Sequence, residues 1–269
     1  MNNPSTDQQV AGARAYEALH VPALFKQWCP RVLDAASVAP GDRILDVACG
    51  TGILAREAAF RVGSTGSVAG VDPGAGMLAV AKEVASGIEW QECAAESLSY
   101  QDRSFDAVVS QFGIMFFSDR SKALREMIRV LKPGGRLAVA VWDSLDNSEA
   151  YSEEVELLQR LAGKEAADAL RAPFALGDKA ELIALFETSG VKSVYVETLT
   201  GTARFPSVRT MVEADLRGWL PVMGVVLQEE QIDRLLTEAE EVLAAYVTAD
   251  GKVEFSAPAH IVTGVAGAV

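Results

Sequence analysis

The sequence predicts an α/β fold with a doubly wound, mostly parallel sheet of seven strands. Two observations support this prediction. Short apolar runs alternate with helix-period segments between residues 43 and 142, an order typical of a parallel sheet covered by helices on both faces. Two glycines one residue apart, Gly50 and Gly52, separate the first apolar run from the first helical pattern. Hydrophobic residues make up 49% of the 269-residue chain, enough for a substantial core.

The first apolar run, at residues 43–47, is of the kind that is buried on both faces of a sheet. An acidic residue, Asp46, lies near its end. The segment 54–62 carries an apolar residue at every fourth position and is followed by Gly63, a typical C-cap, so it predicts a helix. Strand, glycine turn and helix together present a loop to a cofactor, because glycine lets a ligand approach the backbone closely.

The same patterns place the remaining elements. Asp178 and Glu181 resemble a capping box at the start of a helix that ends at Gly190. The amphipathic helix expected at 124–131 ends at Lys132-Pro133-Gly134-Gly135. Strands are expected at 67–72, 88–93, 104–110, 137–142, 191–198 and 259–265, and helices at 77–84, 124–131, 151–162, 179–189, 208–219 and 232–246.

The chain is expected to form one domain with helical additions. Residues 1 to about 12 are expected to be a disordered tail. The segment 14–37 has a helical pattern that Pro22 and Pro30 divide into short pieces. The predicted organisation is an N-terminal helical cap at 1–40 and a cofactor-binding α/β domain at 41–269, with additions at about 145–190 and 202–250.

Composition limits the class of partner. The formal net charge is −13 and the pI about 4.7, so the chain is expected to repel nucleic acid. Three cysteines without metal-type spacing indicate reduced thiols, and no cluster predicts a metal. No apolar run is long enough for a membrane span, and the first ten residues lack the apolar core of a signal peptide. A cytoplasmic protein is therefore expected.

Residues 50–55 fit the dinucleotide fingerprint GxGxxG/A, and Asp72 follows Gly52 by twenty residues at the end of the second strand. At that place a carboxylate accepts hydrogen bonds from both ribose hydroxyls. The alternative is a structural turn with a solvated Asp72. Two cofactor classes fit these features, a nicotinamide dinucleotide and S-adenosylmethionine.

Asp46 helps to separate the two classes. A carboxylate beside the glycines opposes a pyrophosphate, whereas S-adenosylmethionine has no phosphate and carries a positive ammonium and a positive sulfonium. The alternative for Asp46 is a turn-forming residue bonded to the backbone.

Four motifs in order resemble class I S-adenosylmethionine-dependent methyltransferases, most closely the small-molecule branch typified by the ubiquinone and menaquinone biosynthesis methyltransferases. The resemblance covers about residues 43–142, and the flanking segments resemble nothing that indicates a substrate. The motifs are Ile44-Leu45-Asp46-Val47-Ala48-Cys49-Gly50-Thr51-Gly52, Val71-Asp72 with Met77-Leu78, Phe105-Asp106-Ala107-Val108-Val109, and Leu131-Lys132-Pro133-Gly134-Gly135-Arg136-Leu137.

The resemblance implies a Rossmann-like methyltransferase fold and a role for each matching residue. The glycine loop would approach the methionine part of the cofactor, Asp46 its amino group, and Asp72 the ribose diol. Pro73, Gly74 and Met77 would line the adenine. The chain departs from the family at Ala94, where a carboxylate usually meets the adenine amino group; Glu96, a water or packing would replace it. The implied cofactor-binding residues are Asp46, Ala48, Gly50, Thr51, Gly52, Asp72, Pro73, Met77, Ala95, Glu96 and Gln111.

Aromatic residues after the fourth and fifth strands predict an apolar acceptor pocket at the carboxyl edge of the sheet. Phe112, Phe116 and Trp142 are the candidates for its walls, and Trp219 and Met223 for a lid. The alternative is that the aromatic side chains pack in the core.

The chain has only two histidines. His20 lies in the N-terminal cap, which could fold over the cofactor, and Tyr16 precedes it by one helical turn; both are candidates for catalysis. His260 opens the last predicted strand and is expected to be structural, away from the active edge.

The sequence thus favours an S-adenosylmethionine-dependent methyltransferase that acts on a small, fairly apolar acceptor at oxygen, nitrogen or carbon, with S-adenosylhomocysteine as product. The transfer is expected to be an in-line displacement in an enclosed pocket. The alternatives are a nicotinamide-dependent oxidoreductase and a non-catalytic cofactor-binding protein that stabilises a partner. In the last case the helix at 232–246 would form an oligomer surface, such as that of a homodimer.

Overall fold

The computed structural model describes residues 6–267. Seven strands form one sheet in the order β3-β2-β1-β4-β5-β7-β6. The first five in that order are parallel, and β7 runs antiparallel to both β5 and β6. This confirms the predicted fold class. The strands are β1 (Arg43–Val47), β2 (Ser67–Asp72), β3 (Glu89–Glu92), β4 (Phe105–Gln111), β5 (Leu131–Trp142), β6 (Lys192–Phe205) and β7 (Val253–Val265).

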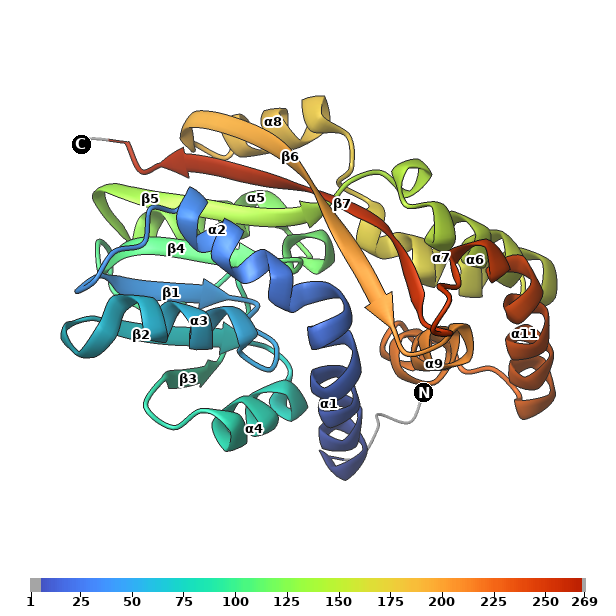
Figure 1. The fold of residues 1–269 in the computed structure, drawn as a ribbon. Coiled ribbons are helices and arrows are strands. Elements are labelled where there is room, and N and C mark those ends of the chain that lie inside the picture. Colours follow the sequence, from blue (N-terminus) through green and yellow to red (C-terminus); the bar gives the residue numbers. More distant parts are fainter. Residues whose placement is uncertain (1–5, 268–269) are drawn as a thin grey trace.

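Helices cover both faces of the sheet (Figure 1). α2 packs beside α3 on one face, and α5 packs beside α8 on the other. The α-helices are α1 (Thr6–His20), α2 (Cys29–Ala35), α3 (Ile53–Val62), α4 (Ala75–Val84), α5 (Arg120–Val130), α6 (Glu149–Leu161), α7 (Lys164–Arg171), α8 (Lys179–Thr188), α9 (Val208–Ala214), α10 (Leu220–Val222) and α11 (Glu229–Val242). Short π-helices lie at η1 (Val21–Phe25) and η7 (Asp215–Trp219), and short 3-10 helices at η2 (Lys26–Trp28), η3 (Gly63–Thr65), η4 (Ile114–Phe116), η5 (Leu145–Asn147), η6 (Ala172–Phe174) and η8 (Ala244–Tyr246).

The N-terminal segment is divided into short helices near Pro22 and Pro30, as expected, but it lacks the expected disordered tail from residue 6 onward. Residues 6–12, predicted to be disordered, belong to α1, while residues 1–5 lie outside the described part. α1 packs closely on α4. At their contact, a Cβ on Gly76 would lie only 2.7 Å from the backbone of Gln9. Only glycine therefore allows the two helices to approach so closely. Such a contact depends on a distant part of the chain, so local patterning does not reveal it.

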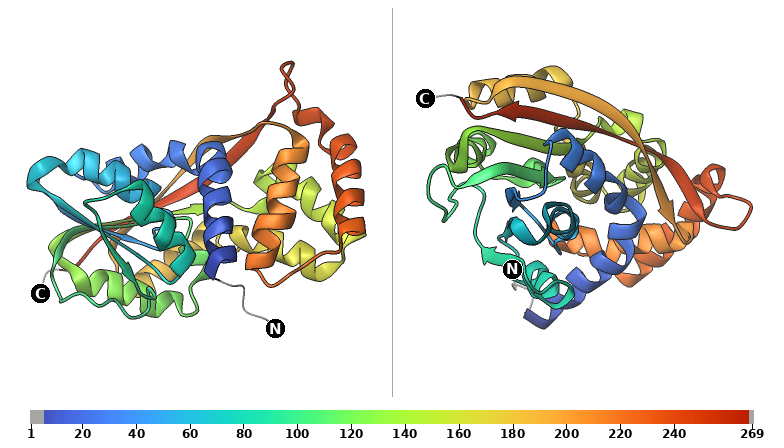
Figure 2. Two further views of the ribbon diagram at one scale, coloured as in Figure 1. Left: turned by 90° about the horizontal axis from the view of Figure 1, so that it is seen from below. Right: turned by 60° about the vertical axis from the view of Figure 1, so that its left-hand side comes forward.

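α1 stands across the carboxyl ends of the parallel strands, between the sheet and the C-terminal helices (Figures 1 and 2). β6 and β7 are longer than predicted. They pair with each other from Lys192 opposite Val265 to Phe205 opposite Val253, so they continue beyond the end of β5. In Figure 1 their far ends reach the region of α6, α9 and α11. The region beyond the carboxyl edge of the sheet is thus built from α1, two strand ends and these helices.

The long C-terminal helix is not available as the oligomer surface considered above. Its apolar stripe, including Ile232, Leu235 and Leu236, is buried within the chain, and the helix packs on α6 and α9. Between residues 6 and 267, no helix combines the length and the apolar character that crossing a membrane requires.

Candidate active site at the carboxyl edge of the sheet

Asp46 is a buried carboxylate near the end of β1. It is 1% exposed, and neither of its oxygens has a hydrogen-bond partner among the described residues. Burial raises its pKa well above the usual value, the nearby Ala55 amide offsets part of this, and the charge of Asp72 adds to it. A turn-forming role is not supported, because such a residue would bond to the backbone. An unpartnered buried acid is costly to keep, so it points to a ligand.

The glycine loop after β1 contains two positions, Gly50 and Gly52, that require glycine for different structural reasons. Gly50 has φ +54°, and a Cβ there would face open space, which suits the close approach of a cofactor. Gly52 has φ +86°, and its Cβ would lie 2.3 Å from the indole of Trp90. Trp90 from β3 therefore packs against Gly52, a contact that the sequence did not predict.

Asp72 ends β2 and fixes the glycine loop. Its Oδ2 accepts the Gly50 N–H at 2.9 Å and its Oδ1 accepts the Gly74 N–H at 2.8 Å. Burial raises its pKa, and these two amides lower it again in part. Each carboxylate oxygen keeps a second lone pair, so Asp72 can still accept the hydroxyls of a sugar.

A cavity of about 170 Å³ lies beside this loop, between the ends of β1, β2, β3 and β4. Glu96, on its wall, accepts the Asp119 N–H at 3.1 Å through Oε1. The cavity is lined by Ala48, Pro73, Cys93, Ala94, Ala95, Glu96, Phe116, Phe117 and Ser118. The structure thus brings Pro73 together with Ala95 and Glu96, whereas Gly74 and Met77, also predicted to line the adenine, are not among the lining residues. A larger cavity of about 220 Å³, lined by Arg103, Leu131 and Pro133 among others, contains none of the predicted residues.

Tyr16 of α1 lies over the carboxylates of this edge. Burial raises its pKa above the usual value, and the charges of Asp72, Glu17, Cys29 and Asp46 add to the effect in that order. Its ring stacks on Phe25 with centroids 5.3 Å apart. The cap therefore covers this edge of the sheet at Tyr16, and a role of Tyr16 toward a ligand stays a prediction.

His20 lies one turn further along α1 and faces the C-terminal helices. Its Nε2 is 3.6 Å from Oδ1 of Asp215, and its Nδ1 is buried without a partner among the described residues. Asp215 is 4% exposed, and its charge raises the pKa of Glu154, which burial already raises. Sequence reasoning missed both acids. The available signal was an acid within an apolar stripe: Glu154 follows Tyr151 by three residues, and Asp215 follows Met211 by four.

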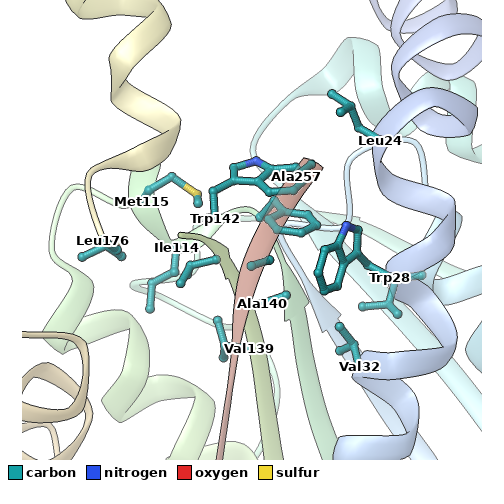
Figure 3. Packing of buried hydrophobic residues seen from close by; sticks show 14 of the residues in the cluster. Leu24, Trp28, Val32, Ile114, Met115, Val139, Ala140, Trp142, Leu176 and Ala257 are labelled. Carbon is teal, nitrogen blue, oxygen red and sulfur yellow. The ribbon is translucent and has the colours of Figure 1, made fainter. Parts of the chain in front are cut away.

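The predicted acceptor walls are divided between core and surface. Phe112 and Trp142 are each 7% exposed and stack with centroids 3.9 Å apart, and Trp28 packs edge-on against both. Figure 3 shows Trp142 in the core between Met115 and Trp28. This packing favours the core alternative for that pair.

Phe116, by contrast, is 42% exposed and lines the cavity, and its ring lies 5.2 Å from that of Trp219. The Trp219 Nε1–H is bonded to the Ala169 carbonyl at 2.9 Å, and Met223 is half-buried in the segment that follows. Gln111 donates to the Phe25 carbonyl at 3.2 Å, while its Oε1 is buried without a partner among residues 6–267.

His260 is structural but not remote from the active edge. An antiparallel strand enters a sheet at the carboxyl ends of its parallel neighbours, so the expected location was wrong. His260 is opposite Val141 of β5, and its ring nitrogens lie 2.9 Å from Thr198 Oγ1 and from the Gly177 carbonyl. In the described residues, no group of acids, histidines or cysteines has the arrangement of a metal site.

Comparison with known proteins agrees with this geometry. Residues 45–139 match the model of a family described as a methyltransferase domain. The ubiquinone/menaquinone biosynthesis C-methyltransferase UbiE of Xanthomonas oryzae is 42% identical over 136 residues, which is 48% of this chain and 52% of that protein. The chain spans about half the length of the curated relatives that it matches.

Two solved structures share the fold. The YcgJ protein of Bacillus subtilis aligns with a TM-score of 0.60 at 19% identity, over 90% of this chain and 99% of that one. A phosphoethanolamine N-methyltransferase of Haemonchus contortus, in complex with phosphomonomethylethanolamine and S-adenosylhomocysteine, aligns with a TM-score of 0.60 at 21% identity, over 96% of this chain and 57% of that one.

Proposed function

We propose that the whole chain transfers a methyl group to a small acceptor. The premise is that residues 45–139 are a methyltransferase domain of the class I, S-adenosylmethionine-dependent type. The observation that carries the proposal is the pairing of Asp46 with Gly50. Asp46 is a buried carboxylate without a hydrogen-bond partner among the described residues, and Gly50, in the loop that follows it, faces open space. This combination suits the ammonium of the methyl donor and opposes the pyrophosphate of a nicotinamide dinucleotide.

The residues present fit the parts of the cofactor. The wall formed by Pro73, Ala95 and Glu96 is proposed to hold the adenine, and Asp72 the ribose hydroxyls. Asp46 and the backbone at Gly50 would meet the amino-acid end. Of the remaining predicted residues, Gln111 would lie between cofactor and acceptor, because its Oε1 is buried and unpartnered while its Nε2 is fixed by Phe25.

The cofactor supplies an activated methyl group, and the protein supplies alignment, exclusion of water and removal of a proton. α1 would cover the site, with Tyr16 beside the bound cofactor. When the Nε2–H of His20 points toward Asp215, the lone pair of Nδ1 is free to accept a proton from the acceptor. Asp215 would then stabilise the imidazolium that forms. His20 is therefore the proposed general base, positioned by Asp215.

The names of the relatives do not fix the acceptor atom. UbiE is named a C-methyltransferase, and the Haemonchus contortus enzyme an N-methyltransferase. Since the chain spans half of its relatives and its acceptor side lies outside the matched residues, the acceptor must be inferred from the site itself. A cytoplasmic location, and a small molecule rather than nucleic acid as partner, remain part of the proposal.

The test is transfer of an isotope-labelled methyl group from S-adenosylmethionine to a panel of hydroxylated, quinone-like and amine compounds, with products identified by mass. We expect transfer to at least one acceptor class, its loss in Asp72→Asn, and its retention in Asp146→Asn, which changes an exposed acid outside the site. Unchanged transfer in Asp72→Asn would remove that residue from the site.

A further inference from the structure

Six side chains beyond the sheet edge form a cluster, named here the acidic–aromatic ring, that is linked by one ion pair, by aromatic contacts and by the electrostatic effect of two acids on a tyrosine. His20 pairs with Asp215 at 3.6 Å, and the charges of Asp215 and Glu154 both act on Tyr151. The ring of Tyr151 packs against Phe255 with centroids 5.4 Å apart, Phe255 stacks on Phe205 at 6.5 Å, and Phe205 returns to His20 at 6.4 Å. The members are His20, Tyr151, Glu154, Phe205, Asp215 and Phe255.

Of the two buried acids of this ring, Asp215 has only His20 as a partner among the described residues, and Glu154 has none. Glu154 is fully buried, and both of its oxygens lack a hydrogen-bond partner among the described residues. Asp215 is 4% exposed, and its Oδ2 lacks a partner as well. Buried acids are normally paired or hydrogen-bonded, because burial of an unpaired charge is costly. The chain keeps these two in a position where apolar side chains would be more stable.

Elsewhere the chain pairs its half-buried acids with cations. Glu17 binds Arg56 at 2.6 Å and Asp42 binds Arg136 at 2.7 Å. Within residues 6–267, no lysine or arginine lies within ion-pair distance of Glu154 or Asp215, and only His20 approaches them. The unpartnered carboxylate oxygens of Glu154 and Asp215 can therefore bind one more positive group. The neighbouring aromatic rings are suitable for the same partner, since a cation is attracted to the face of an aromatic ring.

Asp215 opens the π-helix η7, which continues α9. A turn of π-helix shifts the side chains that follow it and is frequently found at functional sites. Here the shift coincides with the burial of Asp215, while Arg217 in the same turn points to solvent and binds Glu229 at 2.7 Å. The backbone thus directs the acid inward and the nearby cation outward.

We propose that the acidic–aromatic ring binds a positively charged amino group of the methyl acceptor, so that the substrate class is a small organic amine. This inference rests on the proposed function, because it takes the ring to be the acceptor side of the same site. The position supports it: Tyr16 contacts the cofactor edge, and its ring stacks on His20 of the acidic–aromatic ring at 5.6 Å. Donor and amine would then meet beside the face of α1 that carries Tyr16 and His20.

The proposal predicts a proton linkage. Burial raises the pKa of Glu154 and of Asp215; the charge of Asp215 raises that of Glu154 further, and His20 lowers that of Asp215 in part. His20 acts on Asp215, and the charges of both acids raise the pKa of Tyr151. Binding of an ammonium should ionise an acid that is protonated in the free protein. An amine should therefore release a proton on binding, and a neutral analogue should not.

Calorimetry with S-adenosylhomocysteine present tests the proposal in binding, without turnover. The probes are phenylethylamine, tyramine and their N-methylated forms, each beside its alcohol analogue, in buffers of different ionisation enthalpy. The variants are Glu154→Gln and Asp215→Asn, with Glu156→Gln as a matched control on the exposed face of α6. We expect at least one amine to bind more tightly than its alcohol with release of a proton. Glu154→Gln should weaken that binding by roughly tenfold or more, and Glu156→Gln should not.

Two results would overturn the proposal: equal binding of every amine and its alcohol by the wild-type protein, or the same amine affinity in Glu154→Gln and Glu156→Gln. Thermal unfolding of each variant shows whether it is folded, and Asp215→Asn gives an independent arm. Glu154-dependent amine binding without methyl transfer from S-adenosylmethionine would leave this inference standing and refute the proposed function. Methyl transfer to alcohols that does not depend on Glu154 would do the reverse.

Discussion

The rings of Tyr16 and His20 stack with centroids 5.6 Å apart and planes 22° from parallel. The two residues are one turn apart on α1, so their side chains share one face of the helix. The charges of Asp72 and Asp46 raise the pKa of Tyr16, while His20 pairs with Asp215. One helix face therefore joins the cofactor edge to the acidic–aromatic ring, and a displacement of α1 would open both together.

Replacement of Tyr16 tests whether α1 retains the cofactor. Tyr16→Ala removes the ring that covers Asp46 and Asp72, so we expect S-adenosylhomocysteine to dissociate about tenfold faster, measured by stopped-flow fluorescence. Tyr16→Phe keeps the stack on His20 and should dissociate at nearly the wild-type rate. The control is Tyr195→Ala, which removes an exposed tyrosine on β6. Equal rates in Tyr16→Ala and the control would mean that α1 is not a cover.

Asp46 should make cofactor binding depend on pH. Its pKa is raised in the free protein, and an ammonium beside it favours the ionised form. Binding should then release a proton, so that affinity for S-adenosylhomocysteine rises by up to about tenfold per pH unit above the usual value of 3.8 and levels off at the raised pKa. Titration calorimetry from pH 4 upward measures this. Asp46→Asn should lose the dependence; a slope that persists in this variant would assign it to another group.

The contact between Gly52 and Trp90 predicts a stability effect. Gly52→Ala brings a Cβ into the indole of Trp90 in addition to the strain of a positive φ, so we expect a loss of about 2–4 kcal/mol in the free energy of unfolding. Gly224→Ala has a similar positive φ and open space, and should cost only about 1 kcal/mol. Denaturant titration of both variants gives the comparison. Similar losses of unfolding free energy in the two variants would show that the indole of Trp90 moves aside at no energetic cost.

Glu154→Leu should stabilise the fold while it removes a proposed binding group. The pKa of Glu154 is raised by folding, so the wild-type protein loses stability as pH rises from the usual value of 4.5 toward the raised pKa. Leucine does not titrate. Its advantage should be about 1–4 kcal/mol near pH 8 and should diminish toward pH 4.5, measured by denaturant unfolding at each pH. A variant that is less stable than wild type at pH 8 would show that Glu154 has a stabilising partner.

Much of the sheet could be predicted because its signals are local. Apolar runs and a glycine turn identify β1 and α3 from a few adjacent residues, and Asp178 alone caps α8 by accepting the Ala180 and Glu181 amides. The ends of β6 and β7 and the helix at residues 6–12 could not be predicted in this way. They are fixed by pairing between distant strands and by contact with Gly76, which no local pattern reports.

The same distinction holds for the site. Asp46 and Asp72 follow from their places at two strand ends, and the structure puts both at one edge of the sheet. Phe112 and Trp142 were expected at the acceptor and instead pack on Trp28, because aromatic composition does not say which way a ring faces. Glu154 and Asp215 come from helices 61 residues apart, and only tertiary packing shows that they act on each other.

The central claim is that a positively charged methyl donor binds between Asp46, Gly50 and Asp72. Titration calorimetry of the wild-type protein with S-adenosylhomocysteine and, separately, with NADH tests it most directly. The account predicts saturable binding of S-adenosylhomocysteine that Asp72→Asn weakens by roughly tenfold or more, and no measurable binding of NADH. Tight binding of NADH with none of S-adenosylhomocysteine would contradict it.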